Sequence, residues 1–135
     1  MPAARSRLVA LAAVLDLACV LGFAAAGRSA HAEDGGVVGV LGTAWPFLVA
    51  AAVGWAALPA WRDPVRVWPT GVTVWAVTWG LGLALRGLTG GGLAIPFVVV
   101  AAAVLAVAMV GWRAVLTAVT ASARRRQVGD PARAR

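Results

Sequence analysis

Hydrophobic residues form four long windows that are almost free of charge, separated by short polar segments. The windows cover residues 8–27, 35–61, 67–85 and 87–112, and Asp16 is the one charged residue inside them. Each is long enough for a helix to cross a hydrocarbon core about 30 Å thick. Polar and apolar residues do not alternate in a two-residue repeat, so helices are favoured over the strands of a transmembrane barrel. The pattern predicts an all-α fold, a four-helix transmembrane bundle with helices near 8–26, 37–58, 68–86 and 94–112.

Composition supports the same class. Of the 135 residues, 61% are hydrophobic and 13% are charged, which is typical of an integral membrane protein and not of a soluble domain. We expect one membrane domain over residues 1–123. Residues 124–135 begin with three arginines and contain few apolar side chains, so we expect a basic, disordered cytoplasmic tail.

The basic residues predict the orientation of the chain. All twelve are arginine, and with the N-terminus in the cytoplasm only Arg28 and Arg86 lie outside. The positive-inside rule then predicts that both termini are cytoplasmic and that this is a multi-pass protein of the cell inner (cytoplasmic) membrane. The rule accounts for the basic residues without nucleic acid, and we expect anionic lipids at the cytoplasmic face as their partner. The inside set is Arg5, Arg7, Arg62, Arg66, Arg113, Arg124, Arg125, Arg126, Arg133 and Arg135.

The two halves of the chain share short patterns. The Gly-x5-Arg spacing at 22–28 recurs at 80–86, and Gly54-Trp55 recurs as Gly111-Trp112, at a nearly equal offset. A duplicated helical hairpin would explain both repeats, and small transport proteins are built in this way. Duplication is therefore a hypothesis for the fold.

Asp16 is the most informative polar residue, because an ionised carboxylate near mid-bilayer costs at least about 2.5 kcal/mol and is normally paired, protonated or in contact with water. At a rise of about 1.5 Å per residue, Asp16 and Thr78 lie at similar depths, whereas Arg28, Arg86 and Arg113 lie much nearer the two membrane faces. We therefore predict a hydrogen bond from Asp16 to Thr78, or to a tryptophan N–H of the third helix. Asp16 is then either a proton or cation site or a structural anchor between helices. Arg113 is predicted to be an inner-face anchor.

A second polar cluster is expected at the outer face. Arg28, His31 and Arg86 form it, near Glu33 and Asp34. Two guanidinium groups and an imidazole could bind a carboxylate or phosphate, or respond to pH at an entrance. The alternative is ion pairing that ties the first outer loop to the top of the third helix.

The sequence has no apparatus for catalysis. It contains no nucleophile elbow, Walker loop, zinc-protease helix or nicotinamide fingerprint. Cys19 is the only cysteine, and the spacing of His31 from its acidic neighbours matches no metal-binding pattern. We therefore expect a protein that is not an enzyme and has no cofactor and no metal.

The first helix is expected to stay in the protein. Ala30-His31-Ala32 has the small-x-small form of a signal-peptidase site, but the preceding apolar run from Leu8 to Ala26 contains Asp16 and is longer than the roughly 7 to 15 residues of a signal peptide. We interpret residues 24–36 as an outer loop and its flanks.

Several of these residues also form a recognisable pattern. Asp16 is followed by "FAAAGRSAH" at 23–31, "TWGLGLALR" at 78–86, Phe97, and "GWR" at 111–113. In this order and spacing the chain resembles the bacterial membrane family catalogued as domain of unknown function 3054. The resemblance implies a small four-helix integral membrane protein and carries no assigned activity.

Three functions remain open from the sequence. The first is a small non-enzymatic membrane protein whose polar set, Asp16, Thr78, Arg28, His31 and Arg86, shapes an interhelical cavity. The second is a small proton- or ion-coupled transporter or channel that uses Asp16. The third is an accessory subunit of a larger membrane complex, docked through the glycine face of the second helix, and a homo-oligomer or a membrane-protein partner would fit this interpretation.

Overall fold

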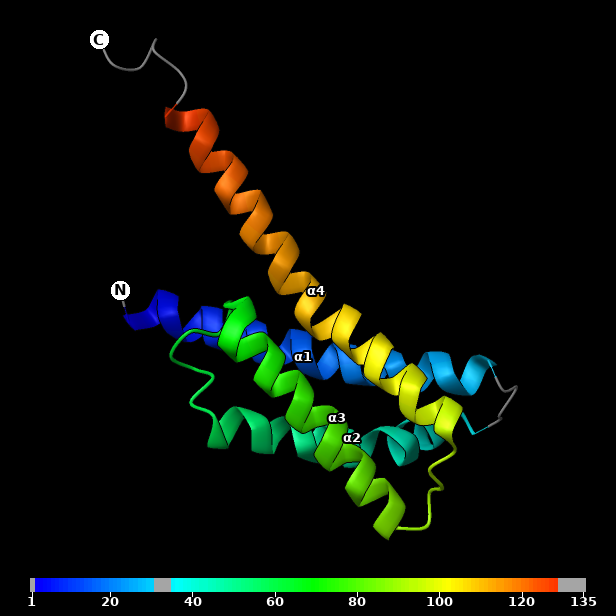
Figure 1. The fold of residues 1–135 in the computed structure, drawn as a ribbon. Coiled ribbons are helices and arrows are strands. Elements are labelled where there is room, and N and C mark those ends of the chain that lie inside the picture. The colour runs from blue at the N-terminus through cyan, green and yellow to red at the C-terminus, as the bar shows by residue number, and fades with distance from the viewer. Residues whose placement is uncertain (1, 31–34, 129–135) are drawn as a thin grey trace.

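The computed structural model of the chain describes residues 2–30 and 35–128. In this part of the chain there are four α-helices: α1 (Pro2–Ala30), α2 (Gly36–Ala57), α3 (Val72–Leu88) and α4 (Ile95–Val128) (Figure 1). A short helical turn, η1 (Val67–Gly71), precedes α3. Each of the four helical segments, with η1 counted together with α3, is long and apolar enough to cross a membrane. The predicted all-α, four-helix class is therefore confirmed.

The helices form a bundle in which each helix packs mainly against two others. α1 packs against α2 and α4, and α3 packs against the same two helices. Figure 1 shows α3 and α4 running obliquely across α1 and α2. α1 and α3 therefore lie on a diagonal. We call the end of the bundle where α1 begins and α2 joins η1 the N-terminal end, and the other the opposite end.

The observed helices are longer than predicted at several boundaries. α1 extends beyond 8–26 at both ends, and α4 continues past residue 112 to Val128. Residues 124–128 are therefore helical, which corrects the disordered tail predicted from residue 124, and residues 129–135 lie outside the described part. The prediction ended helices at arginines. However, arginine is a good helix former whose long side chain can reach water from within a helix.

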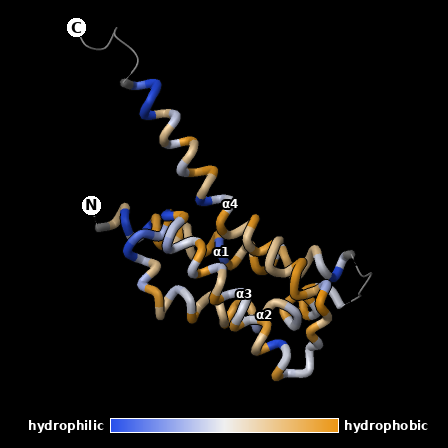
Figure 2. The backbone as a smooth tube through the Cα atoms, viewed as in Figure 1, coloured by the Kyte–Doolittle hydropathy of each residue, from blue (hydrophilic) through white to orange (hydrophobic). Residues whose placement is uncertain are grey.

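The outer surface of the bundle is strongly apolar. Leu11, Val38 and Val107 are 62%, 82% and 75% exposed. Figure 2 shows hydrophobic residues along the bundle and a hydrophilic stretch near the end of α4. A helix that is apolar on its outer as well as its inner face suits a lipid environment. The four helices thus define a multi-pass membrane protein.

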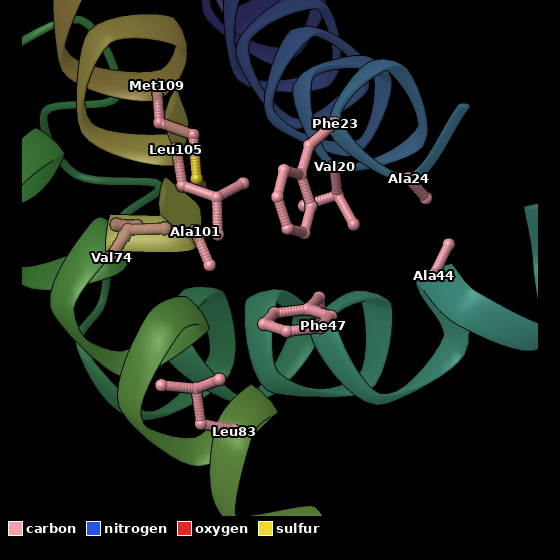
Figure 3. Close-up of a cluster of buried hydrophobic side chains, with 11 residues drawn as sticks. Val20, Phe23, Ala24, Ala44, Phe47, Val74, Leu83, Ala101, Leu105 and Met109 are labelled. Atoms are coloured by element: carbon pink, nitrogen blue, oxygen red, sulfur yellow. The ribbon is translucent and has the colours of Figure 1, made fainter. Parts of the chain in front are cut away.

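The core is built from small residues around a few large ones. Phe23 of α1, Phe47 of α2 and Phe97 of α4 form a triangle of ring contacts, with centroids 5.5 Å apart for Phe23–Phe47 and 6.0 Å for Phe23–Phe97. A Cβ atom at Gly82 of α3 would overlap the Phe47 ring, so a glycine is needed for this close approach. Figure 3 shows much of the surrounding cluster, which includes Val20, Ala24, Ala44, Val74, Leu83, Ala101, Leu105 and Met109.

Two tryptophans join α3 to α4. The indole N–H groups of Trp75 and Trp79 donate to the carbonyl oxygens of Ala102 and Val98, each at 3.1 Å, and the two rings are stacked. Buried indoles commonly combine packing with one hydrogen bond in this way. The pair therefore holds two adjacent helices together.

Candidate functional site

Asp16 lies in the middle of α1 and is fully buried. Its Oδ1 accepts hydrogen bonds from Arg113 Nη1 at 2.7 Å and Trp112 Nε1 at 3.0 Å. Its Oδ2 accepts from Arg113 Nη2 at 2.7 Å and Trp55 Nε1 at 3.0 Å. The pair is a bidentate salt bridge, the strongest geometry available to arginine and a carboxylate. We call Asp16, Arg113, Trp55 and Trp112 the clamp.

Arg113 is also fully buried, and its remaining contacts extend the clamp to the α2–α3 link. Its Nε donates to the carbonyl oxygen of Pro64 at 3.0 Å, and its Nη1 donates to that of Met109 at 2.7 Å. Its guanidinium carbon lies 4.3 Å from the centroid of the Trp112 ring. Gly71 leaves room for the aliphatic stem, because a Cβ there would be 2.7 Å from Arg113 Cδ. One side chain thus connects α1, α4 and the link before α3.

The electrostatics of the clamp favour a fixed arrangement. Taking two charges out of water is costly, and the cost is recovered only when the geometry is good and the remaining donors and acceptors are satisfied. Both Asp16 oxygens have two donors, and no buried side-chain nitrogen or oxygen in residues 2–30 and 35–128 lacks a hydrogen bond. The clamp is therefore a saturated ion pair that holds helices together.

The predicted partners of Asp16 are wrong. Thr78 is buried, but its hydroxyl donates to the carbonyl oxygen of Val74 in its own helix at 2.7 Å. The tryptophans that bind Asp16 come from α2 and α4, whereas those of α3 bind α4. The physical reason is the diagonal placement of α1 and α3, which equal depth along the chain does not reveal.

The prediction that Arg113 lies too far from Asp16 for a direct pair is also wrong. It assumed that α4 ends near residue 112, whereas Arg113 lies well inside a helix that ends at Val128. One sequence signal pointed to the clamp. The repeated Gly-Trp pairs at 54–55 and 111–112 supply the two indoles, one for each oxygen of the carboxylate.

A pocket of about 590 Å³ lies at the opposite end of the bundle. Arg28 of α1, Thr43 of α2 and Arg86 of α3 provide its polar side chains. The other lining residues are glycine or apolar: Phe23, Ala24, Gly27, Gly91, Gly92, Ala94, Pro96, Phe97 and Val100. All four helices and the α3–α4 link therefore contribute to one pocket. The lining includes two arginines and, among the described residues, no carboxylate.

The two arginines are held differently. Arg28 donates from Nη1 to Thr43 Oγ1 at 3.5 Å, and its guanidinium fills the space above Gly39, where a Cβ would be 2.5 Å from Nη2. Arg86 donates from Nε to the carbonyl oxygen of Gly92 at 3.3 Å and lies 4.6 Å from the Phe97 ring centroid. The structure thus brings Arg28 and Arg86 to one pocket, and both were predicted to lie in one polar cluster. His31, the third predicted member, lies outside the described residues, as do Glu33 and Asp34.

Part of the predicted docking face on α2 is used inside the protein. Gly39 belongs to the glycine run at the start of that helix, and Arg28 of the same chain packs directly on it. Metal binding has no support from the described residues, which contain no group of three His, Cys, Asp or Glu side chains placed to hold an ion. The absence of a metal and of a cofactor stays a prediction.

The fold and the clamp define a class, a four-helix membrane protein with a buried Asp16–Arg113 pair. A comparison with known protein families matches residues 13–116 to the family described as "Protein of unknown function (DUF3054)". The match covers most of the chain, from before Asp16 to after Arg113, so the chain belongs to this family, and the resemblance stated above is confirmed. Neither the curated proteins nor the solved structures that were searched contain a match to it.

Proposed function

We propose that this protein is a non-enzymatic, multi-pass protein of the cytoplasmic membrane that binds a small ligand in the pocket at the opposite end of the bundle. The observation that carries the proposal is the pocket itself. Its volume of about 590 Å³ is within the range of roughly 300–1,000 Å³ that is typical of small-molecule sites. An apolar lining with a few convergent polar groups is also the usual composition of such a site.

The clamp supports a binding role over proton-coupled transport. A proton site must gain and lose its proton during each cycle, so it needs contact with water or a partner that moves away. Asp16 is fully buried, and its oxygens already accept four hydrogen bonds, two of them from Arg113. In this proposal Asp16 therefore fixes the helices, and the ligand site lies elsewhere.

The orientation in this proposal has both termini in the cytoplasm, so the pocket faces the outer leaflet. The positive-inside rule supports it, because most of the arginines flank the N-terminal end of the bundle. Anionic lipids at that face would be the partners of the basic end of α4. Reporter fusions after Val128 and within the α3–α4 link test this directly. A reporter that requires the cytoplasm should be active only in the first fusion, and the reverse result would contradict the orientation.

The repeated Gly-Trp pairs support duplication of a helical hairpin as the origin of this arrangement. Trp55 is in α2, the second helix of the first hairpin, and Trp112 is in α4, the second helix of the second hairpin. Each donates one hydrogen bond to a different oxygen of Asp16 at 3.0 Å. Residues that a duplication would make equivalent thus have the same role towards Asp16.

The binding function is tested with a variant whose larger side chain fills the pocket. Gly27 lines it, and a Cβ at Gly27 would meet no atom within 4 Å, so Gly27→Leu should fill space without disturbing the helix. Gly80 of α3 is equally open and lies outside the pocket, so Gly80→Leu is the matched control. The wild-type protein and the control, extracted in lipid nanodiscs, should carry a small molecule at a fixed ratio in native mass spectrometry.

The filled variant should lose that molecule. If the wild-type protein carries no small molecule, or if Gly27→Leu carries it at the same ratio, the proposed function is wrong. Circular dichroism of the three proteins should show equal helix content, so that a loss of ligand reports the pocket and not unfolding.

A further inference from the structure

We propose that the ligand of this pocket is an anionic amphiphile, a molecule with one carboxylate or phosphate head group on a single apolar chain. This inference rests on the proposed binding function and assigns the chemical class of its ligand. It follows from three properties of the pocket, which are its charge, its apolar wall and the surface onto which it opens.

The charge of the pocket calls for an anion. Arg28 and Arg86 come from different helices and line the same space. In the described part of the chain no carboxylate pairs with Arg86, and its hydrogen bond to the carbonyl oxygen of Gly92 uses Nε, so its two Nη groups remain available for a ligand. Guanidinium groups bind carboxylate and phosphate oxygens through two parallel N–H bonds. A head group would therefore be held by the Nη groups of Arg86, with the positive charge of Arg28 lining the same space.

The wall of the pocket calls for an apolar chain. Phe23 and Phe97 are in contact with each other and both line the pocket, and Ala24 lies beside Phe23. Arg86 lies over the face of Phe97, so the charged and apolar parts of the wall are adjacent. A ligand with a charged head joined directly to methylene groups matches a wall whose charged part lies next to its apolar part. A small inorganic anion would leave the aromatic wall without a partner.

The position of the opening fits entry from the bilayer. Val100 lines the pocket on α4 and is 53% exposed on the apolar outer surface of the bundle. Ile95, at the start of the same helix, is 78% exposed. A chain bound along Phe97 can continue past Val100 into surrounding lipid. The arginines meanwhile lie near the end of the bundle, at the level where lipid head groups are expected.

Competition in nanodiscs of zwitterionic phosphatidylcholine tests the assignment. A hexadecanoic acid that carries a photoreactive diazirine should label the wild-type protein on peptides that contain Phe23 or Phe97. Laurate and dodecyl phosphate should compete for this site at least about tenfold better than dodecanol, which has the same chain without charge. Acetate and inorganic phosphate, which have the head group alone, should not compete. The order of laurate and dodecyl phosphate identifies which head group the site prefers.

Four variants separate the effect of the Arg86 charge from the effect of the space in the pocket. Arg86→Gln should weaken labelling at least about tenfold, because the loss of a single charged hydrogen bond to the head group has that effect on affinity. Arg86→Lys keeps a positive charge and should restore part of the labelling. Gly27→Leu should abolish labelling, and Gly80→Leu should leave it unchanged.

The outcomes distinguish the two proposals. If dodecanol competes as well as laurate, or Arg86→Gln labels like wild type, while Gly27→Leu still blocks labelling, the ligand class is wrong and the binding function stands. If a two-chain phosphatidylglycerol competes as well as laurate, the site is a general contact with lipid phosphate, and the ligand class is also wrong. If Gly27→Leu has no effect on any probe, both proposals fail.

Discussion

Arginine is used in two opposite ways at the two sites of this bundle. In the clamp, Arg113 is fully buried, and its Nη groups are bound to the oxygens of Asp16 at 2.7 Å. In the pocket, Arg86 is partly exposed beside an aromatic ring, and its two Nη groups have no partner among the described residues. The same residue type therefore holds the fold at one site and can receive a ligand at the other. The two arginines differ because Arg113 has a buried carboxylate, that of Asp16, within hydrogen-bonding distance.

The largest expected effect comes from breaking the clamp. Arg113→Met leaves the Asp16 carboxylate buried without its cation, which should lower the free energy of unfolding by about 3–5 kcal/mol. Unfolding by sodium dodecyl sulfate from dodecyl maltoside micelles, followed by circular dichroism, measures it. Arg66→Met is the matched control, because Arg66 and Asp63 form a 3.6 Å pair in which both side chains are 65% exposed. That control should cost less than about 1 kcal/mol.

The double variant Asp16→Leu, Arg113→Met sharpens the same comparison. It removes both charges, so it should recover much of the stability lost in Arg113→Met. Recovery should be incomplete, because the Trp55 and Trp112 N–H groups lose their acceptor. If Arg113→Met is as stable as wild type, Asp16 is not an anchor of the bundle.

An intermediate effect is expected from a single methyl group added at each site. Gly71→Ala places a Cβ 2.7 Å from Arg113 Cδ, and overpacking of this kind typically costs about 1–3 kcal/mol. Gly27→Ala, at the pocket, adds a Cβ that meets nothing within 4 Å, so it should be neutral or stabilise the helix by up to about 1 kcal/mol. The same detergent unfolding assay compares the two. Equal effects would mean that the two sites are packed equally tightly.

The smallest effect on stability should come from Arg86. Arg86→Gln removes a hydrogen bond to Gly92 and the contact with the Phe97 ring at a partly exposed position. We expect a change below about 1 kcal/mol in the free energy of unfolding, because such contacts are weak when water is near. A loss as large as that of Arg113→Met would show that Arg86 is a structural residue, and the contrast between the two sites would disappear.

Much of the fold could be predicted from the sequence, because lipid imposes a simple requirement on it. A charge-free stretch long enough to cross a membrane, such as 35–61, favours a helix, because backbone groups there cannot bond to water. The predicted helix at 37–58 accordingly differs little from α2 (Gly36–Ala57). Boundaries marked by arginine were predicted less well, since α1 and α4 both continue past such residues.

The candidate sites could be predicted only in part. The charged residues were identified, because charges such as Asp16 and Arg86 are conspicuous in an apolar sequence, whereas Trp55 and Trp112 were not predicted to belong to the site. The pairing of Asp16 was not, because depth along an assumed helix placed Thr78 at the same level and Arg113 too far away. Once α4 continues to Val128, Arg113 is an interior residue of that helix and the argument from depth no longer applies.

By itself the sequence determined the all-α membrane class, the number of helices in the described part of the chain, and the few polar residues available for chemistry. These properties follow from local composition, because a segment inserts into lipid as a helix when its own residues are apolar. Only the tertiary structure decided that α1 and α3 lie on a diagonal and that Asp16 meets Arg113. These pairings depend on which helices are neighbours, and that choice is made by packing among residues far apart in the chain, such as Gly82 against Phe47.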